Sequence, residues 1–257
     1  MKTKDLGFVG GGRVTKIILQ AFQNKNVAFD SISVFEPDGE TAAGLKRQFP
    51  EIELADTPQK AAGQDIVFLA VHPPVMMETL NKINETVTRD TMVISLAPKI
   101  SLEKIAAILP TGKIARMIPN AASYINKGYN PVTFNPSITS KEKQTLTRIL
   151  EVLGKTMEAE EGMLEGYAIV SAMLPTCFWF QWKKMEEIAI KTGFSEAGAK
   201  KVVRDTLEIS ITLYYESGLS PDEVMDLIPV RPIGENEEQI EQILESKLLG
   251  LFEKIKP

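Results

Sequence analysis

Short apolar runs alternate with helical patterns along the first half of the chain. Runs with the length and continuous apolar character of buried strands lie at residues 6–10, 32–35, 52–55, 66–71, 92–96 and 114–117. Between them, apolar residues recur with helical spacing, as at 14–22 and 40–49, and a further helix starts at Ser101. This alternation predicts an α/β fold with a doubly wound, mainly parallel sheet.

The second half of the chain changes character. Residues 128–157 have the pattern strand, helix, strand, with Thr139 and Glu142 at capping-box spacing. After about residue 160 the strand signals stop. Helices are predicted at 164–192, broken or kinked at Pro175, then at 195–217, from Ser220 onward, and along an apolar face at 240–255. We therefore expect two domains, 1–158 with the sheet and 159–257 entirely helical.

A glycine-rich turn directly follows the first predicted strand and opens the first helix. In Gly10-Gly11-Gly12, the first glycine allows a tight turn and the next lets the backbone approach a pyrophosphate. The helix N-terminus adds unpaired N–H groups and a positive dipole end. Thr15 replaces the third glycine, which we expect to loosen helix–strand packing. The strand–turn–helix–strand context predicts a Rossmann-type site for a nicotinamide dinucleotide, and a tight turn without a ligand is the alternative.

The end of the second predicted strand bears on the type of cofactor. Glu36 stands there, where a carboxylate accepts hydrogen bonds from ribose hydroxyls and repels a 2′-phosphate. No arginine or lysine follows until Lys46. The pattern favours NAD over NADP. Alternatively, Glu36 and Asp38 simply cap a turn.

Composition and charge narrow the classes of partner. A net charge of -5 argues against nucleic acid or an anionic membrane as partner. The chain contains no uninterrupted apolar stretch of about 18 residues, so we expect no membrane-spanning helix. Cys177 is the only cysteine and His72 the only histidine, which excludes an internal disulfide and a Cys/His zinc site, so we expect no metal. Residues 1–4 lead into the first strand without the apolar region of a signal peptide, and we expect a cytoplasmic protein.

The order of these motifs resembles the pyrroline-5-carboxylate reductase family. GFVGGGRVTKII at 7–18 is similar to the family's GFIGAGNMAxAI, and IVFLAVHPPVM at 66–76 to its VILAVKPQV. MVISLAPKISLEKI at 92–105 resembles VISIAAGISLExL, and ARMIPNAAS at 115–123 resembles VRVMPNTPA. The correspondence covers about 150 residues. It implies an oxidoreductase of proline biosynthesis with a Rossmann domain and a helical domain through which such enzymes form homodimers.

The resemblance also carries over individual residues. Those that would line the pyrophosphate are Gly10, Gly12, Arg13 and Val14. Those that would pass beside the cofactor, or lie near the nicotinamide and its ribose, are Ala70, Val71, His72, Pro73, Ser95, Ala97 and Asn120. The family ends its second strand in Asn-Arg, whose arginine helps to hold a 2′-phosphate. Glu36-Pro37 in that place agrees with a preference for NAD.

The helical domain departs from the family in its chemistry. The family's LSGSGPAY corresponds to VSAMLPTC at 170–177, which keeps Ser171 and Pro175 but loses both glycines, so Met173 and Leu174 would partly fill the space. The family's SPGGTT loop, which holds the substrate carboxylate, has no counterpart, and the nearest stretch is 230–236. Substrate contacts are expected from Asn120, Pro175, Thr176 and Arg231. A different imine or keto substrate is as consistent with this pattern as pyrroline-5-carboxylate.

Several residues are candidates for catalysis, each with a structural alternative. His72 at the end of a strand would protonate a substrate nitrogen, or else pack against the cofactor. Lys99 and Arg231 would bind a carboxylate, or else lie in solvent. Ser171, like His72 and Lys99, is a candidate for catalysis. Cys177 is expected to be a buried small hydrophobe, and the aromatic residues at 178–182 predict a homodimer interface, with core packing as the alternative.

Two classes of function follow. The first is a reductase that transfers hydride from NAD(P)H to a C=N or C=O bond of a small substrate that bears a carboxylate. The second is a nucleotide-binding regulatory or sensor protein that has lost catalysis, which the missing loop favours. A deazaflavin carrier in place of the nicotinamide also remains open. A polar pocket near His72, Lys99, Asn120 and Ser171 would favour the enzyme.

Overall fold

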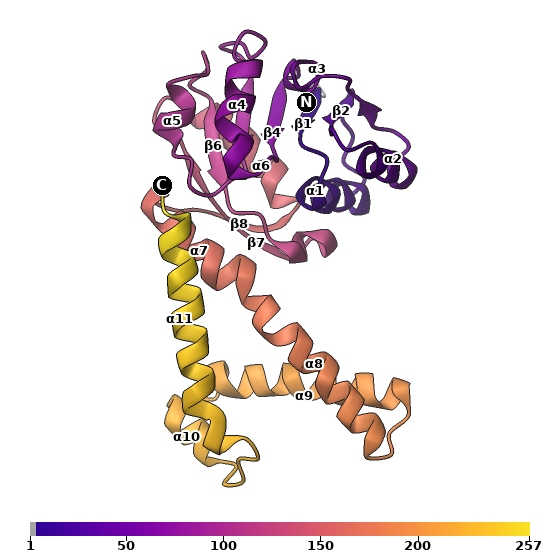
Figure 1. The fold of residues 1–257 in the computed structure, drawn as a ribbon, viewed down its shortest axis with the longest axis vertical. Coiled ribbons are helices and arrows are strands. Elements are labelled where there is room, and N and C mark those ends of the chain that lie inside the picture. Colours follow the sequence, from indigo (N-terminus) through magenta and orange to yellow (C-terminus); the bar gives the residue numbers. More distant parts are fainter. Residues whose placement is uncertain (1–3) are drawn as a thin grey trace. The chain divides into compact units, whose positions relative to one another are not determined.

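The computed structural model describes residues 4–257 and divides the chain into two compact units. The first unit runs to Ala172 and also takes in Leu251–Pro257, and the second is Met173–Gly250 (Figure 1). The domain boundary expected after residue 158 coincides with the end of the last strand, whereas the first compact unit continues to Ala172. Residues 1–3, on which the expectation of no signal peptide partly rests, lie outside the described residues.

The first unit is built on an eight-stranded sheet in the order β3-β2-β1-β4-β5-β6-β7-β8. Neighbouring strands are parallel except for the pair β6 and β7. The strands are β1 (Leu6–Val9), β2 (Ile32–Phe35), β3 (Glu53–Leu54), β4 (Ile66–Leu69), β5 (Met92–Ser95), β6 (Ile114–Met117), β7 (Gly128–Phe134) and β8 (Gly154–Glu158). The doubly wound, mainly parallel α/β fold expected from the apolar runs is confirmed.

Helices cover both faces of this sheet. Side chains of α1 (Arg13–Asn24), α2 (Gly39–Gln48) and α6 (Ser140–Glu151) share one apolar cluster with strand residues. The opposite cluster is formed with α3 (Pro58–Ala62), α4 (Pro73–Ile83) and α5 (Leu102–Ala106). All four residues of β1, β4, β5 and β6 are buried. This two-sided burial explains why these strands are apolar runs rather than alternating patterns.

Capping residues fix several helix starts, including those expected at Ser101, Thr139 and Ser220. Thr57 and Ser101 accept hydrogen bonds from the first turns of α3 and α5, with Pro58 at the start of α3. Thr139 and Glu142 form a complete capping box on α6. Ser220 and Glu223 form another on α10 (Pro221–Asp226). Each box satisfies backbone N–H groups that the helix itself leaves without partners.

A continuous helical stretch leads from the first unit into the second. It comprises η2 (Glu161–Met163), α7 (Leu164–Tyr167), a π-helical segment η3 (Ala168–Met173) and α8 (Leu174–Lys191). The interruption expected at Pro175 takes the form of this π segment, because proline has no N–H to donate to the carbonyl of Ser171. By length and composition alone, Glu161–Lys191 is also apolar enough to cross a membrane. Its apolar residues do not form one uninterrupted run, because Ser171, Thr176 and Gln181 lie among them.

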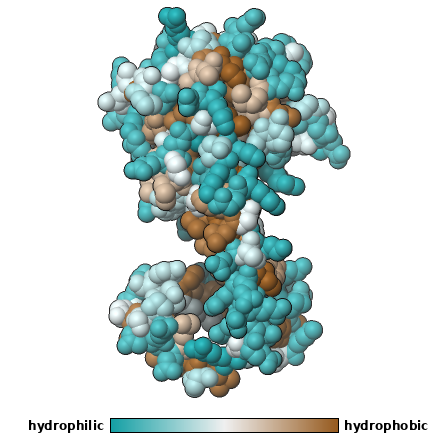
Figure 2. Space-filling view, turned by 60° about the vertical axis from the view of Figure 1, so that its left-hand side comes forward, coloured by the Kyte–Doolittle hydropathy of each residue, from teal (hydrophilic) through white to brown (hydrophobic). Residues whose placement is uncertain are grey.

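The second unit consists of α8, α9 (Glu196–Glu216), α10, the short η4 (Gly234–Asn236) and most of α11 (Glu237–Ile255). Helices α8, α10 and α11 contain no buried residue, and α9 contains only Ala199. Large apolar side chains instead reach the surface of these helices, among them Phe180, Ile209 and Tyr215. Figure 2 shows patches of hydrophobic residues among the hydrophilic ones on the surface. The unit therefore lacks an apolar core of its own within one chain.

Candidate functional site

The candidate site lies where the strand order of the sheet reverses. From the central pair β1 and β4, the chain builds outward through β2 on one side and β5 on the other. Doubly wound sheets bind ligands at the carboxyl ends of the strands at this switch point. The glycine turn follows β1 and residues 70–72 follow β4, so the structure brings these two predicted segments together.

Gly10 makes the turn after β1 and tolerates no side chain. Its φ is +107°, and an added Cβ would lie 2.5 Å from the carbonyl oxygen of Ala70. Its N–H donates to the Phe35 carbonyl at 2.8 Å, and its carbonyl accepts from the Thr15 hydroxyl at 2.5 Å. Thr15 is fully buried. The expectation that Thr15 loosens the packing is therefore wrong, because its hydroxyl ties α1 to the turn.

Gly12 faces open space at the start of α1. An added Cβ would meet nothing within 4 Å, and no side chain caps the first turn of this helix. The N–H groups of Arg13 and Val14 belong to that turn, where no intrahelical acceptor exists for them. An uncapped helix N-terminus beside a glycine turn fits a pyrophosphate. The residues present at this turn therefore fit a dinucleotide.

Glu36 lies directly against the turn. Its carboxylate accepts from the N–H of Gly11 at 2.8 Å and from the N–H of Asp38 at 3.0 Å. An added Cβ on Gly11 would come within 2.7 Å of the Cβ of Glu36, so only glycine permits this approach. Asp38 caps α2 through Thr41, and hydrogen bonds from the Thr41 hydroxyl and then from its backbone N–H lower the pKa of Asp38. Glu36 thus lies at the end of β2 against the glycine turn, and its contacts stabilise the β2–α2 turn.

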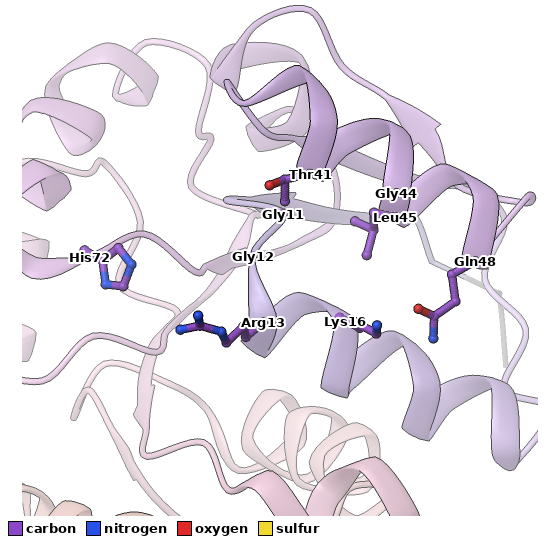
Figure 3. A pocket seen from close by; sticks show the side chains of 9 residues that line it. All are labelled: Gly11, Gly12, Arg13, Lys16, Thr41, Gly44, Leu45, Gln48 and His72. Atoms are coloured by element: carbon purple, nitrogen blue, oxygen red, sulfur yellow. The ribbon is translucent and has the colours of Figure 1, made fainter.

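A cavity of about 520 Å³ opens beside the turn (Figure 3). Its lining residues come from the glycine turn, α1, α2 and the end of β4: Gly11, Gly12, Arg13, Lys16, Thr41, Gly44, Leu45, Gln48 and His72. His72 is exposed, occupies the N-cap of α4 and makes no side-chain hydrogen bond to that helix. Of the four residues near which a polar pocket was expected, only His72 lines this cavity.

The other residues predicted beside the cofactor follow β4 and β5. Ala70, Val71 and Pro73 are half-buried, whereas Ser95 and Ala97 are buried. The hydroxyl of Ser95 has no hydrogen-bond partner among residues 4–257, although it is fully enclosed. A buried hydroxyl without a partner is unusual and marks a place where a further polar group would be stabilised.

Lys99 lies in a loop held by a buried ion cluster that sequence reasoning missed. Its φ is +75°, a conformation that favours glycine, and the resembling family motif carries glycine here. Its N–H donates to Glu165 at 3.1 Å. Arg116, 1% exposed, donates to Glu165 and to Glu161, each at 2.6 Å, and Glu161 also accepts from the N–H of Leu102. The cluster fixes the backbone of the Lys99 loop and leaves the lysine side chain exposed.

Asn120 and Ser171 are brought together, but they bond to each other. The side-chain amide of Asn120 donates to the carbonyl of Ser171 at 3.0 Å, and its oxygen accepts from Ala122. The Ser171 hydroxyl donates to the carbonyl of Tyr167. Pro175, Thr176 and Arg231 belong to the second unit, where Thr176 donates to Met173 and Arg231 lies 3.5 Å from Glu237.

Known proteins similar to this chain share both its sequence motifs and its fold. The family model described as "NADP oxidoreductase coenzyme F420-dependent" matches residues 5–99. Pyrroline-5-carboxylate reductase of Escherichia coli (strain K12) is 29% identical over 228 residues, covering 88% of this chain and 84% of the relative. That of Corynebacterium melassecola is 24% identical, covering 96% of this chain and 93% of the relative.

Solved structures extend the likeness to the whole fold. The crystal structure of Plasmodium falciparum pyrroline carboxylate reductase with NADP bound superposes with a TM-score of 0.81 at 18% identity, covering 100% of this chain and 98% of that one. The Streptococcus pyogenes 1-pyrroline-5-carboxylate reductase gives 0.77 at 18% identity, with coverages of 100% and 99%. The chain is thus similar to pyrroline-5-carboxylate reductases over most of its sequence, and it shares the fold of the solved ones.

Proposed function

We propose that this protein is an NAD(P)-dependent oxidoreductase that transfers hydride to the C=N or C=O bond of a small substrate bearing a carboxylate. The observation that carries the proposal is the open glycine turn at the switch point of the sheet, beside a cavity that takes in His72. The names of the relatives support a reductase of an imine, and pyrroline-5-carboxylate is the first substrate to test. Such a reaction belongs to proline biosynthesis in the cytoplasm.

The chain's own residues would hold and orient the cofactor. Gly12 and the first turn of α1 bind the pyrophosphate, with Arg13 as a nearby cation. Glu36 accepts hydrogen bonds from the ribose, which favours NADH. Residues 70–73, with Ser95 and Ala97, form the wall beside the nicotinamide. The bound nicotinamide supplies the hydride.

A proton must reach the substrate nitrogen or oxygen, and we propose His72 and Lys99 as its donors. Both are exposed in the first unit, His72 at the cavity and Lys99 on the loop held by Glu165. Ser171 is the third candidate, although its hydroxyl now donates to Tyr167. Asn120, Pro175, Thr176 and Arg231 remain the proposed substrate contacts. In this role Arg231 exchanges the Glu237 carboxylate for that of the substrate.

We also propose that the protein is a homodimer that associates through its second unit. A helical unit with Ala199 as its only buried apolar residue does not exclude enough apolar surface from water to be stable alone. The exposed apolar side chains of α8 and α9 would pack against the same helices of a second copy. On α8 they include Phe178, Trp179 and Phe180. A self-complementary interface of this kind is the usual form of a homodimer.

One observation favours a second candidate, a nucleotide-binding sensor without catalysis. The Asn120 amide donates to the backbone carbonyl of Ser171, and the Ser171 hydroxyl donates to the carbonyl of Tyr167. Of the expected pocket residues, only His72 reaches the cavity. A sensor needs the cofactor site alone.

The test is turnover of pyrroline-5-carboxylate, followed by loss of reduced nicotinamide absorbance with NADH and with NADPH. We expect substrate-dependent turnover that is faster with NADH. The Gly12→Ala variant is the matched control. It adds a methyl group in open space and leaves the fold intact, but it obstructs the pyrophosphate and should abolish turnover. If NADH binds but neither this substrate nor other cyclic imines or keto acids are turned over, the proposed reductase activity is overturned. That result would favour the sensor.

A further inference from the structure

The cavity beside the glycine turn continues into a gap between α1 and α2. There its lining is Lys16 from α1 and Thr41, Gly44 and Gln48 from α2, with Leu45 buried beneath (Figure 3). The absence of a side chain on Gly44 keeps this part open. Because the same cavity includes Gly11 and Gly12, a ligand anchored at the turn has a continuous path into the gap.

The gap is bordered by cations without counter-ions. Arg13 and Lys16 stand three residues apart on the first turns of α1, and the guanidinium of Arg47 lies near Gly44, where an added Cβ would be 3.8 Å from it. None of these three side chains makes an ion pair or a side-chain hydrogen bond in the part of the chain that the structure describes. By contrast, neighbouring Lys46 donates to the carbonyls of Pro50 and Ile52.

The carboxylates near the gap either accept hydrogen bonds from the backbone or lie exposed at the start of α2. Glu36 accepts two backbone N–H groups, and Asp38 caps α2 through Thr41. Glu40 in the first turn of α2 is exposed. The three cations are therefore not neutralised by the acidic residues around them. A cluster of unpaired cations with amide and hydroxyl groups in a cavity suits a phosphate group.

Building on the proposed dinucleotide site, we propose that the gap between α1 and α2 binds a phosphate carried on the adenosine ribose, as in NADPH, with Lys16 as its main cation. Glu36 then serves the unphosphorylated ribose and Lys16 the phosphorylated one, and the protein accepts both cofactors. Lys16 belongs to α1, before β2, whereas the arginine of the similar family follows its second strand.

The test is the dissociation constant of NADH and of NADPH, each measured from the change in nicotinamide fluorescence on binding. In Lys16→Ala we expect NADPH to bind about tenfold more weakly and NADH unchanged, because only the phosphorylated ribose reaches that lysine. Arg13→Ala should weaken both cofactors, since both carry the pyrophosphate. Lys25→Ala, at the far end of α1, is the matched control and should change neither.

Each other outcome has a definite meaning. Equal weakening of NADH and NADPH in Lys16→Ala would overturn the inference, because the lysine would then serve the shared pyrophosphate. An unchanged NADPH constant in that variant, or wild-type binding of NADH without NADPH, would also overturn it. Failure of the wild-type protein to bind either dinucleotide would instead overturn the proposed function.

Discussion

Glu142 combines a helix cap with an ion pair. It accepts hydrogen bonds from the N–H and hydroxyl of Thr139 and lies 3.0 Å from Lys113. The backbone hydrogen bond from Thr139, followed by its hydroxyl and by Lys113, lowers the pKa of Glu142 from 4.5 to about 2. A carboxyl whose pKa is lowered on folding stabilises the protein above its unfolded pKa. That stabilisation is lost as the pH falls from about 4.5 to about 2.

The prediction concerns the Glu142→Gln variant. At neutral pH we expect its free energy of unfolding to be lower than that of the wild type by about 1 kcal/mol, the usual effect of weakening a cap. The difference should shrink between pH 4.5 and pH 2 as the wild-type carboxyl is protonated. Urea unfolding followed by circular dichroism across this range measures it. A difference that stays constant with pH would contradict this account.

Residues were predictable where their role depends on near neighbours. The glycine turn, the helix starts at Thr139 and Ser220, and the place of Glu36 all follow from local spacing. The Arg116 cluster was not predicted, because its carboxylates lie 45 and 49 residues further along the chain. The one available signal was an arginine inside an otherwise apolar strand. Lys16 was also missed, since α2, across the gap, comes from another part of the chain.

The π segment η3 is the element whose geometry depends on a single missing donor. In an α-helix the N–H of residue 175 would bond to the carbonyl of Ser171, but Pro175 has none, and Asn120 donates to that carbonyl instead. In Asn120→Asp, an oxygen replaces the donor and faces the carbonyl, while the cap on Ala122 is kept. We expect this variant to lose about 1–3 kcal/mol of unfolding free energy.

A double-mutant cycle isolates this contact. Pro175→Ala restores an N–H that can bond to the Ser171 carbonyl, so Asn120→Asp should cost less in that background. Urea unfolding of the four proteins, including the wild type, gives the coupling energy. Equal costs in both backgrounds would show that Asn120 does not compensate for the proline.

At the scale of elements, the spacing of apolar residues and the capping, glycine and proline residues at their ends predicted the strands and most helices. The order of the strands and the antiparallel placement of β7 were not foreseen, because pairing is decided by packing between distant segments. The π segment was foreseen only as a break or kink at Pro175. Its form depends on Asn120, which lies on a loop after β6.

For the whole molecule, the surface of the second unit predicts its state of association. We expect the wild-type protein to have twice the mass of one chain in sedimentation equilibrium. Phe180→Glu, at a side chain 67% exposed in one chain, should shift the protein toward monomer because it would place a charge in the apolar interface. Leu54→Glu, on the edge strand β3, is the control and should leave the mass unchanged. A wild-type monomer would contradict the proposal.

The return of residues 251–257 to the first unit has a consequence for synthesis on the ribosome. Ile255 packs against a small cluster of Ile118, Leu164 and Ala168, whereas the two main clusters are complete by Leu153. A nascent chain can therefore close the sheet early, but this cluster stays open until residue 255 has left the exit tunnel. A chain that terminates prematurely within α11 would keep that apolar surface uncovered, in the form that chaperones and proteases recognise.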